Sequence, residues 1–105
     1  MIRVTFLYPN KPGSRFNADY YIDVHMPLAI KRLQPALKGA TAEIGISSAM
    51  PGQPAPYAAI AVFLFESIEA FTAAVMPHYA ELQADIPNYT DVEPVVQISE
   101  QRIAV

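Results

Sequence analysis

The stretch from Phe16 to Leu28 gathers most of the side chains in this chain that could carry out chemistry. It contains two tyrosines, two carboxylates and His25, one of only two histidines in the sequence. A histidine with an unperturbed pKa of about 6.5 can give or take a proton at neutral pH. Tyr21 lies four residues earlier on the same face of a predicted helix. This pattern indicates acid–base chemistry, with His25 as the proton shuttle and Tyr21 or Tyr8 as a hydrogen-bond donor that polarises a ligand oxygen.

A purely structural role for His25 is the alternative. Pro27 has no N–H, and its ring blocks the helical hydrogen bond to the carbonyl of Asp23. His25 could then bond to a backbone carbonyl that the proline leaves free. The tyrosines also have a structural interpretation, because aromatic side chains dominate packed cores and interfaces. The sequence leaves both interpretations open for His25 and favours packing for Tyr20.

Other reactive arrangements are weakly indicated or absent from the sequence. Asp19 and Asp23 are four residues apart, but His25 falls on nearly the opposite side of the helix from Asp23, so we expect no metal site. His78 follows a proline and is expected to be solvated. The chain has no cysteine, which excludes thiol nucleophiles and cysteine-ligated zinc. Neither a phosphate-binding loop nor a dinucleotide fingerprint occurs, so we expect no cofactor.

Composition limits the class of protein and its partners. A chain of 105 residues with 52% hydrophobic and 16% charged residues predicts a single globular domain over residues 1–105. The net charge of −3 argues against nucleic acid as a partner. The longest apolar run, 58–65, is far shorter than the roughly 20 residues of a membrane helix. No secretory signal is visible, so we expect a cytoplasmic protein with no membrane partner.

The first half of the chain predicts a strand followed by an interrupted helix. Residues 2–8 alternate with a period of two, which favours a strand. Asn17 is a favourable N-cap for the helix that follows. Pro27 should interrupt this helix, and Pro35 should end its second part near Gly39. The helix carries an apolar stripe at three- and four-residue spacing, formed by Ile22, Met26, Ala29, Leu33 and Leu37.

The second half predicts three strands and one helix. A weak strand is expected over 41–48 and the strongest one over 57–65, with a proline-rich loop between them. Ser67 should cap a helix that Pro77 breaks, and a last strand is expected over 94–103. The resulting order, βαββαβ, predicts an α+β fold of the ferredoxin-like sandwich type.

The strand over 58–65 also predicts a partner chain, because it is apolar on both faces. One face holds Ile60, Val62 and Leu64, and the other holds Ala61, Phe63 and Phe65. Two helices can cover only one face of a four-stranded sheet, and a face in contact with water would be polar. A second copy of the chain is the simplest cover for the remaining face. We therefore expect a homodimer.

Two stretches of the sequence resemble a known family. The first is Phe16-x3-Tyr20-x4-His25-Met26-Pro27-Leu28, which follows a strand ending in Tyr8-Pro9. The second covers residues 85–90 and continues over 94–99. Both resemble the EthD family, named after ethyl tert-butyl ether degradation, and the resemblance spans nearly the whole chain. It implies a ferredoxin-like subunit that pairs into a dimeric α/β barrel, and it implies that His25 is the residue suspected of acid–base work.

The resemblance also connects the chain with cofactor-free isomerases of muconolactone type and with dehydratases or decarboxylases of polyketide tailoring. We therefore expect a small cofactor-independent enzyme of catabolism or secondary metabolism, with His25 as its acid and base. The ligand would be an apolar aromatic or lactone-like small molecule in a cleft between the sheet and the broken first helix. The expected lining is Phe6, Tyr8, Phe16, Tyr21 and Phe63. The alternatives are a non-catalytic accessory protein that binds a hydrophobic compound for a partner oxygenase, and a purely structural dimerisation module.

Overall fold

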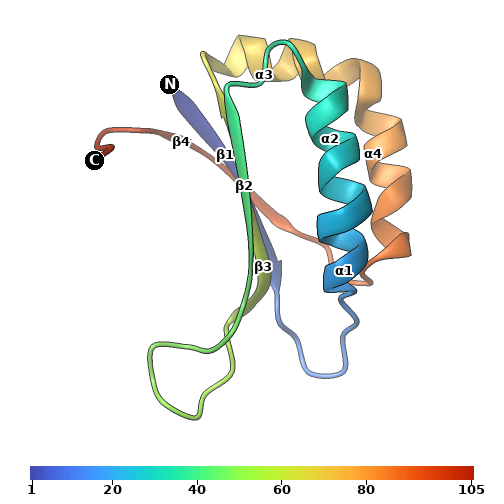
Figure 1. Cartoon of the computed structure of the whole chain (residues 1–105), viewed down its shortest axis with the longest axis vertical. Helices are drawn as coiled ribbons and strands as arrows, with labels where there is room; N and C mark the ends of the chain where they lie inside the picture. Colours follow the sequence, from blue (N-terminus) through green and yellow to red (C-terminus); the bar gives the residue numbers. More distant parts are fainter.

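Four antiparallel strands form one sheet in the order β2-β3-β1-β4, and two helical segments cover one of its faces (Figure 1). The structure, a computed structural model, describes all 105 residues. Helical segments and strands follow one another in the order βαββαβ, which confirms the predicted α+β ferredoxin-like fold. The strands are β1 (Ile2–Pro9), β2 (Gly39–Ile44), β3 (Tyr57–Phe65) and β4 (Val95–Glu100).

Each helical segment consists of several short helices. The first contains α1 (Ala18–Tyr20), the π-helical turn η1 (Tyr21–His25) and α2 (Met26–Leu33). The second contains α3 (Ile68–Val75), the 3-10 turn η2 (Met76–His78), α4 (Tyr79–Asp85) and the 3-10 turn η3 (Ile86–Asn88). The predicted caps are confirmed, because the side chains of Asn17 and Ser67 each accept a backbone N–H at 3.1 Å. None of these helices combines the length and the apolar character that crossing a bilayer requires.

Pro27 does not break the first helical segment as the sequence analysis expects. The π-helical turn precedes it, and there the Met26 N–H donates to the carbonyl of Tyr21. Pro27 then lies in the first turn of α2, a position where a helix tolerates proline because it needs no N–H there. The helical backbone therefore continues past the proline, with one turn wider than the others.

The π-helical turn also changes which residues face the sheet. The turn contains one extra residue. Before the turn, the residues that face the sheet therefore lie one position earlier in the sequence than they would in a regular helix. Tyr21 and His25 are therefore buried, whereas Ile22, predicted as part of the apolar stripe, is 39% exposed. The prediction for the rest of the stripe is confirmed, since its remaining members are buried: Met26, Ala29, Leu33 and Leu37.

Strand β2 covers residues 39–44 rather than the predicted 41–48. Gly45, which follows it, passes so close to β3 that a Cβ atom at this position would collide with the carbonyl of Tyr57. Glycine is the residue that permits such a close approach. Strand β2 therefore ends where its backbone comes too close to β3 to leave room for a side chain.

Strand β4 covers residues 95–100 rather than the predicted 94–103. Its last residue, Glu100, pairs with Ile2, which is the first residue of β1. Beyond this pair one more hydrogen bond forms, from the N–H of Gln101 to the carbonyl of Met1 at 3.2 Å, and β1 itself begins at Ile2. The last five residues therefore leave the sheet and project from its uncovered side (Figure 1).

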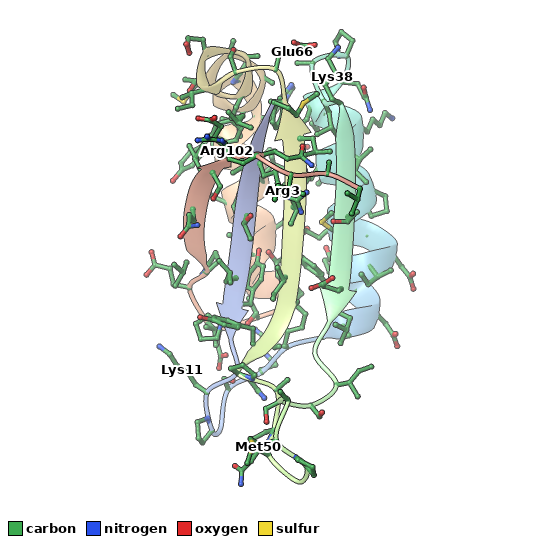
Figure 2. All side chains as sticks on the ribbon, turned by 90° about the vertical axis from the view of Figure 1, so that its left-hand side faces the viewer. Arg3, Lys11, Lys38, Met50, Glu66 and Arg102 are labelled. Carbon is green, nitrogen blue, oxygen red and sulfur yellow. The ribbon has the colours of Figure 1, made fainter.

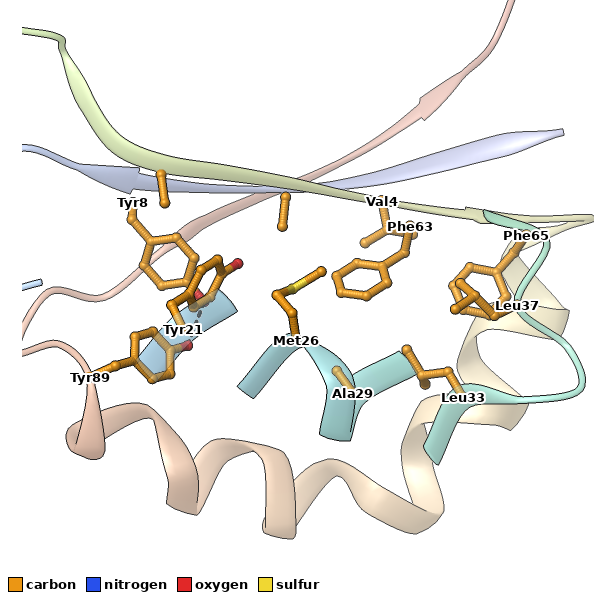
Figure 3. Packing of buried hydrophobic residues seen from close by; sticks show 12 residues of the cluster. Val4, Tyr8, Tyr21, Met26, Ala29, Leu33, Leu37, Phe63, Phe65 and Tyr89 are labelled. Carbon is orange, nitrogen blue, oxygen red and sulfur yellow. Dashed lines mark hydrogen bonds between the residues drawn. The ribbon is translucent and has the colours of Figure 1, made fainter. Parts of the chain in front are cut away.

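The core lies between the helices and one face of the sheet (Figure 3). Alternation along β1 and β3 directs Val4, Phe63 and Phe65 toward the helices, where each is at most 5% exposed. The helices leave the opposite face uncovered (Figure 2). On that face lie three apolar residues of β3 and one of β1. All four are half-buried: Ile60, Val62, Leu64 and Leu7.

Replacement of Phe65 by alanine should destabilise the protein by about 3–5 kcal/mol, because the fully buried ring would leave a cavity that its neighbours fill only in part. Chemical denaturation followed by circular dichroism measures this loss. Ile46→Ala is the control, since Ile46 is 95% exposed and its truncation should change the free energy of unfolding by less than about 0.5 kcal/mol. Equal losses in the two variants would contradict this assignment of the core.

Candidate functional site

A cavity of about 440 Å³ lies between the helical segments and the sheet. Of its 19 lining residues 14 are hydrophobic, which is typical of sites for small apolar molecules. Phe6 and Phe63 line it from the sheet, and Met26 and Leu33 line it from the first helical segment. The exposed lining residues mark its mouth, between the second helical segment and the entry to β4: Thr72, Met76, Tyr79, Gln83, Glu93 and Val96.

Most of the predicted site residues line this one cavity: Phe6, Tyr8, Tyr21, His25 and Phe63. Phe16 does not line it. Its ring packs behind the wall against Tyr8, Tyr21 and Tyr89, with ring centroids 5.4, 5.2 and 5.6 Å away. Phe16 therefore does not take the lining position that the sequence predicts, and its ring instead supports the neighbouring tyrosines.

His25 bonds to two side chains, and not to a backbone carbonyl as the structural alternative expects. Its Nδ1 lies 2.9 Å from Oδ2 of Asp85, and its Nε2 lies 3.4 Å from the hydroxyl of Tyr89. An ionised carboxylate can only accept a hydrogen bond, so Nδ1 carries the proton and Nε2 keeps a free lone pair. The basic nitrogen of the ring therefore faces the tyrosines and not the carboxylate.

Asp85, the last residue of α4, is held by three side-chain donors. Besides its contact with His25, its Oδ1 accepts the hydroxyl of Tyr20 at 2.6 Å and the amide Nδ2 of Asn88 at 2.9 Å. Burial alone would raise the pKa of Asp85, but the three hydrogen bonds together lower this pKa below its usual value. The carboxylate therefore stays ionised beside the imidazole and fixes its orientation.

Three tyrosines gather around His25 at one end of the cavity, where Figure 3 shows Tyr8, Tyr21 and Tyr89 side by side. The hydroxyls of Tyr8 and Tyr89 are 2.7 Å apart, and the ring of Tyr21 stacks on the imidazole with centroids 5.6 Å apart. Burial raises the pKa of all three hydroxyls. The phenols therefore keep their protons at neutral pH and can donate hydrogen bonds.

Asp85, His25, Tyr89 and Tyr8 thus form a chain of hydrogen bonds that ends at the cavity wall. The four side chains come from α4, η1, the segment after η3 and β1. Tyr89 is fixed in this chain by its own backbone, because its carbonyl accepts the N–H of Asn17 at 2.7 Å. The arrangement can pass a proton between the cavity and the imidazole, since each hydroxyl both donates and accepts.

Asp85 and Tyr89 are the site residues that the sequence analysis did not single out. Their hydrogen bonds to His25 join positions 60 and 64 residues apart, which no local pattern reveals. The only available signal was the resemblance over residues 85–90. Tyr20, assigned to packing, also has a polar role, because its hydroxyl holds the carboxylate of Asp85.

The remaining polar candidates lie outside the cavity. Asp19 and Asp23 are exposed, and His78 is half-buried but does not line the cavity. No group of three or more His, Cys, Asp and Glu side chains lies close enough to hold a metal ion.

Asp85→Asn should reduce the stability of the protein in a pH-dependent way. The pKa of Asp85 is lower in the folded protein than in the unfolded chain, so its contribution is fully present above the unfolded value of about 3.9 and is lost as the pH falls through the folded value. The difference in unfolding free energy between wild type and variant should therefore shrink as the pH falls below about 4. Denaturant titrations over this range measure it, with the exposed Asp23→Asn as control. A difference that stays constant with pH would show that the charge of Asp85 does not matter.

Comparisons with known proteins agree with this geometry. A sequence model of the EthD domain matches residues 16–93. Among solved structures, the chain is similar to an EthD-like protein from Ralstonia eutropha JMP134, with 43% identity, 94% of this chain and 89% of that chain covered, and a TM-score of 0.90. A search of curated protein sequences finds no match.

More distant structures share the fold. An ethyl tert-butyl ether degradation (EthD) family protein from Bacillus halodurans C-125 has 16% identity and a TM-score of 0.75, over 97% of this chain and 99% of that one. HapK from Hahella chejuensis has 15% identity and a TM-score of 0.63, over 100% of this chain and 96% of that one. The domain match and the 43% identity to the Ralstonia protein show that the chain belongs to the EthD family.

Proposed function

We propose that this protein is a cofactor-independent enzyme that moves a proton on a small apolar molecule, with His25 as its acid and base. The reaction class is an isomerisation, dehydration or decarboxylation of an aromatic or lactone-like compound, in catabolism or secondary metabolism. The observation that carries this proposal is the hydrogen-bonded chain from Asp85 through His25 and Tyr89 to Tyr8, which ends at the wall of the apolar cavity. It joins a titratable group with a fixed tautomer to the place where a ligand can bind.

The chain can carry a proton in either direction. In the resting state Tyr8 donates to Tyr89, Tyr89 donates to Nε2 of His25, and the imidazole donates to Asp85. When Tyr8 accepts a proton from a ligand carbon, its own proton moves to Tyr89 and the proton of Tyr89 moves to Nε2. The imidazolium so formed is stabilised by the carboxylate of Asp85. The reverse sequence returns the proton to another atom of the ligand.

Tyr21 would act on the ligand oxygen. Its ring lines the cavity, and its raised pKa keeps the hydroxyl protonated. A hydrogen bond from this hydroxyl would stabilise the negative charge that develops on a carbonyl oxygen when a neighbouring carbon loses its proton. The separation of 3.4 Å between His25 and Tyr89 is long for a hydrogen bond, and such contacts in empty sites commonly tighten once the ligand is bound.

A non-catalytic accessory protein that binds a hydrophobic compound for a partner oxygenase is the second candidate. It is favoured by one observation: every buried side-chain nitrogen and oxygen already has a hydrogen-bond partner. A cavity with satisfied walls can hold an apolar ligand without reacting with it. The two candidates differ in the role of His25. The enzyme needs His25 for turnover, whereas the accessory protein does not need it.

The proposed assembly is a homodimer in which the uncovered faces of two sheets pack together as a dimeric α/β barrel. Ile60, Val62 and Leu64 on this face are half-buried and apolar, whereas an antiparallel sheet that faces water usually presents polar residues. A second copy would remove these side chains from water with the same surface on both subunits.

His25→Ala should lower the rate of the reaction by about 10²–10⁴-fold, the usual contribution of an acid–base residue. A thermal-shift screen of small aromatics, lactones and polyketide fragments finds ligands, and NMR then follows the turnover of those that stabilise the protein. His78→Ala is the matched control, because this second histidine does not line the cavity. Near-normal turnover in His25→Ala would refute the acid–base role. Unchanged binding in His25→Ala with no turnover by wild type would favour the accessory protein.

Light scattering at micromolar concentration should give twice the mass of the chain. Val62→Lys should shift the protein to monomers, because it places a charge between Ile60 and Leu64 on the uncovered face. Ala73→Lys carries the same charge on the exposed side of α3 and should leave the dimer intact. A wild-type protein that is strictly monomeric, or a dimer that Val62→Lys does not weaken, would rule out this interface.

A further inference from the structure

Apart from the polar residues at its mouth, the cavity has one polar end, and no cationic side chain lies in its wall. Tyr8, Tyr21 and His25 gather at one end, and Phe71 and Val75 are among the side chains that line the rest. No lysine or arginine is among its lining residues. This arrangement suits a ligand with an apolar body and a single polar end that accepts a hydrogen bond from the hydroxyl of Tyr21.

The charges that border the cavity are negative. Glu93 is one of the exposed residues at the mouth, and Oδ2 of Asp85 lies 2.9 Å from Nδ1 of His25. Any positive charge on His25 is therefore already paired. Arg32, the arginine of the first helical segment, is also paired, through two hydrogen bonds of 2.9 and 3.2 Å to Glu81. The whole chain adds a net charge of −3.

An anionic ligand would meet two costs in this cavity. It would lose the water that hydrates its charge, and the apolar wall offers no cation to replace that water. It would also pass the carboxylate of Glu93 on entry, where like charges repel. An uncharged oxygen has neither cost, because it needs only a hydrogen-bond donor, which the hydroxyl of Tyr21 can supply.

We propose that the cavity takes uncharged ligands, namely aromatic or lactone-like ketones, esters or phenols, and rejects the carboxylates and phosphates of the same shape. The oxygen lies against Tyr8 and Tyr21, and the apolar body extends toward Phe71 and Val75. Glu93 strengthens the rejection of anions at the mouth. This selectivity rests on the proposed function only in taking the cavity as the ligand site, and it does not depend on any reaction.

Equilibrium dialysis at pH 7 with 2-acetylnaphthalene and 2-naphthoate tests the proposal, because the two probes share a ring system and differ in charge. Wild type should bind the ketone at least about tenfold more tightly than the carboxylate. Glu93→Lys should bind 2-naphthoate several-fold more tightly than wild type does, with little change for the ketone. Glu69→Lys makes the same change in net charge on α3, outside the cavity, and should leave both affinities as in wild type.

The proposal is overturned if 2-naphthoate binds as tightly as the ketone, if both lysine variants gain the same affinity for it, or if wild type binds neither probe. These outcomes concern binding alone. The acid–base role of His25 is judged by the turnover of His25→Ala, so the two ideas can fail separately. A wild type that selects the ketone but never turns over any ligand would keep the selectivity and discard the enzyme.

Discussion

The wide π-helical turn over Tyr21–His25 is the constraint on which the rest of the site depends. In a regular helix the inward positions of this segment would belong to the stripe that includes Ile22. The extra residue of the turn instead brings Tyr21 and His25 inward and leaves Ile22 at the surface. One additional residue in one turn therefore replaces an aliphatic side chain in the core by a phenol and an imidazole. π-Helical turns of this kind are frequent at functional sites.

A histidine that is turned inward needs partners, and the second helical segment supplies the decisive one. A buried polar group without a hydrogen bond would cost about 1–3 kcal/mol. Asp85 satisfies Nδ1 of His25 and at the same time joins the end of α4 to η1. The pair of Arg32 and Glu81 joins the same two helical segments further along, but it is exposed and contributes little. The contact of His25 with Asp85 therefore joins the two helical segments and also determines which ring nitrogen of His25 carries the proton.

The sequence was sufficient for the features that regular periodicity encodes. The order of the elements, the caps at Asn17 and Ser67 and the inward aromatic residues of the sheet follow from alternation and helical spacing. The inward position of Tyr21 in place of Ile22 does not, because a π-helical turn breaks the period by one residue.

The partners of His25 were out of reach for a different reason. Asp85 and Tyr89 meet it only after both helical segments have packed on the sheet, and no spacing along the chain records a contact between positions 60 or more residues apart. The sequence could therefore point to His25 and to several residues that line the cavity. It could not predict the chain of hydrogen bonds that places the proton on Nδ1 and leaves Nε2 as the acceptor.

The composition of this polar cluster argues for chemistry and against packing. Apolar side chains of similar volume would fill the same space at equal or lower cost, since buried charged and polar groups often add no stability over a hydrophobic replacement. An accessory protein that only holds an apolar ligand would need one or two donors in the wall. Neither core packing nor the holding of an apolar ligand requires an ionised carboxylate behind the imidazole, because neither depends on which ring nitrogen carries the proton. A proton transfer does depend on it, and the three donors that hold Asp85 in its ionised form would meet that requirement in addition to joining the two helical segments.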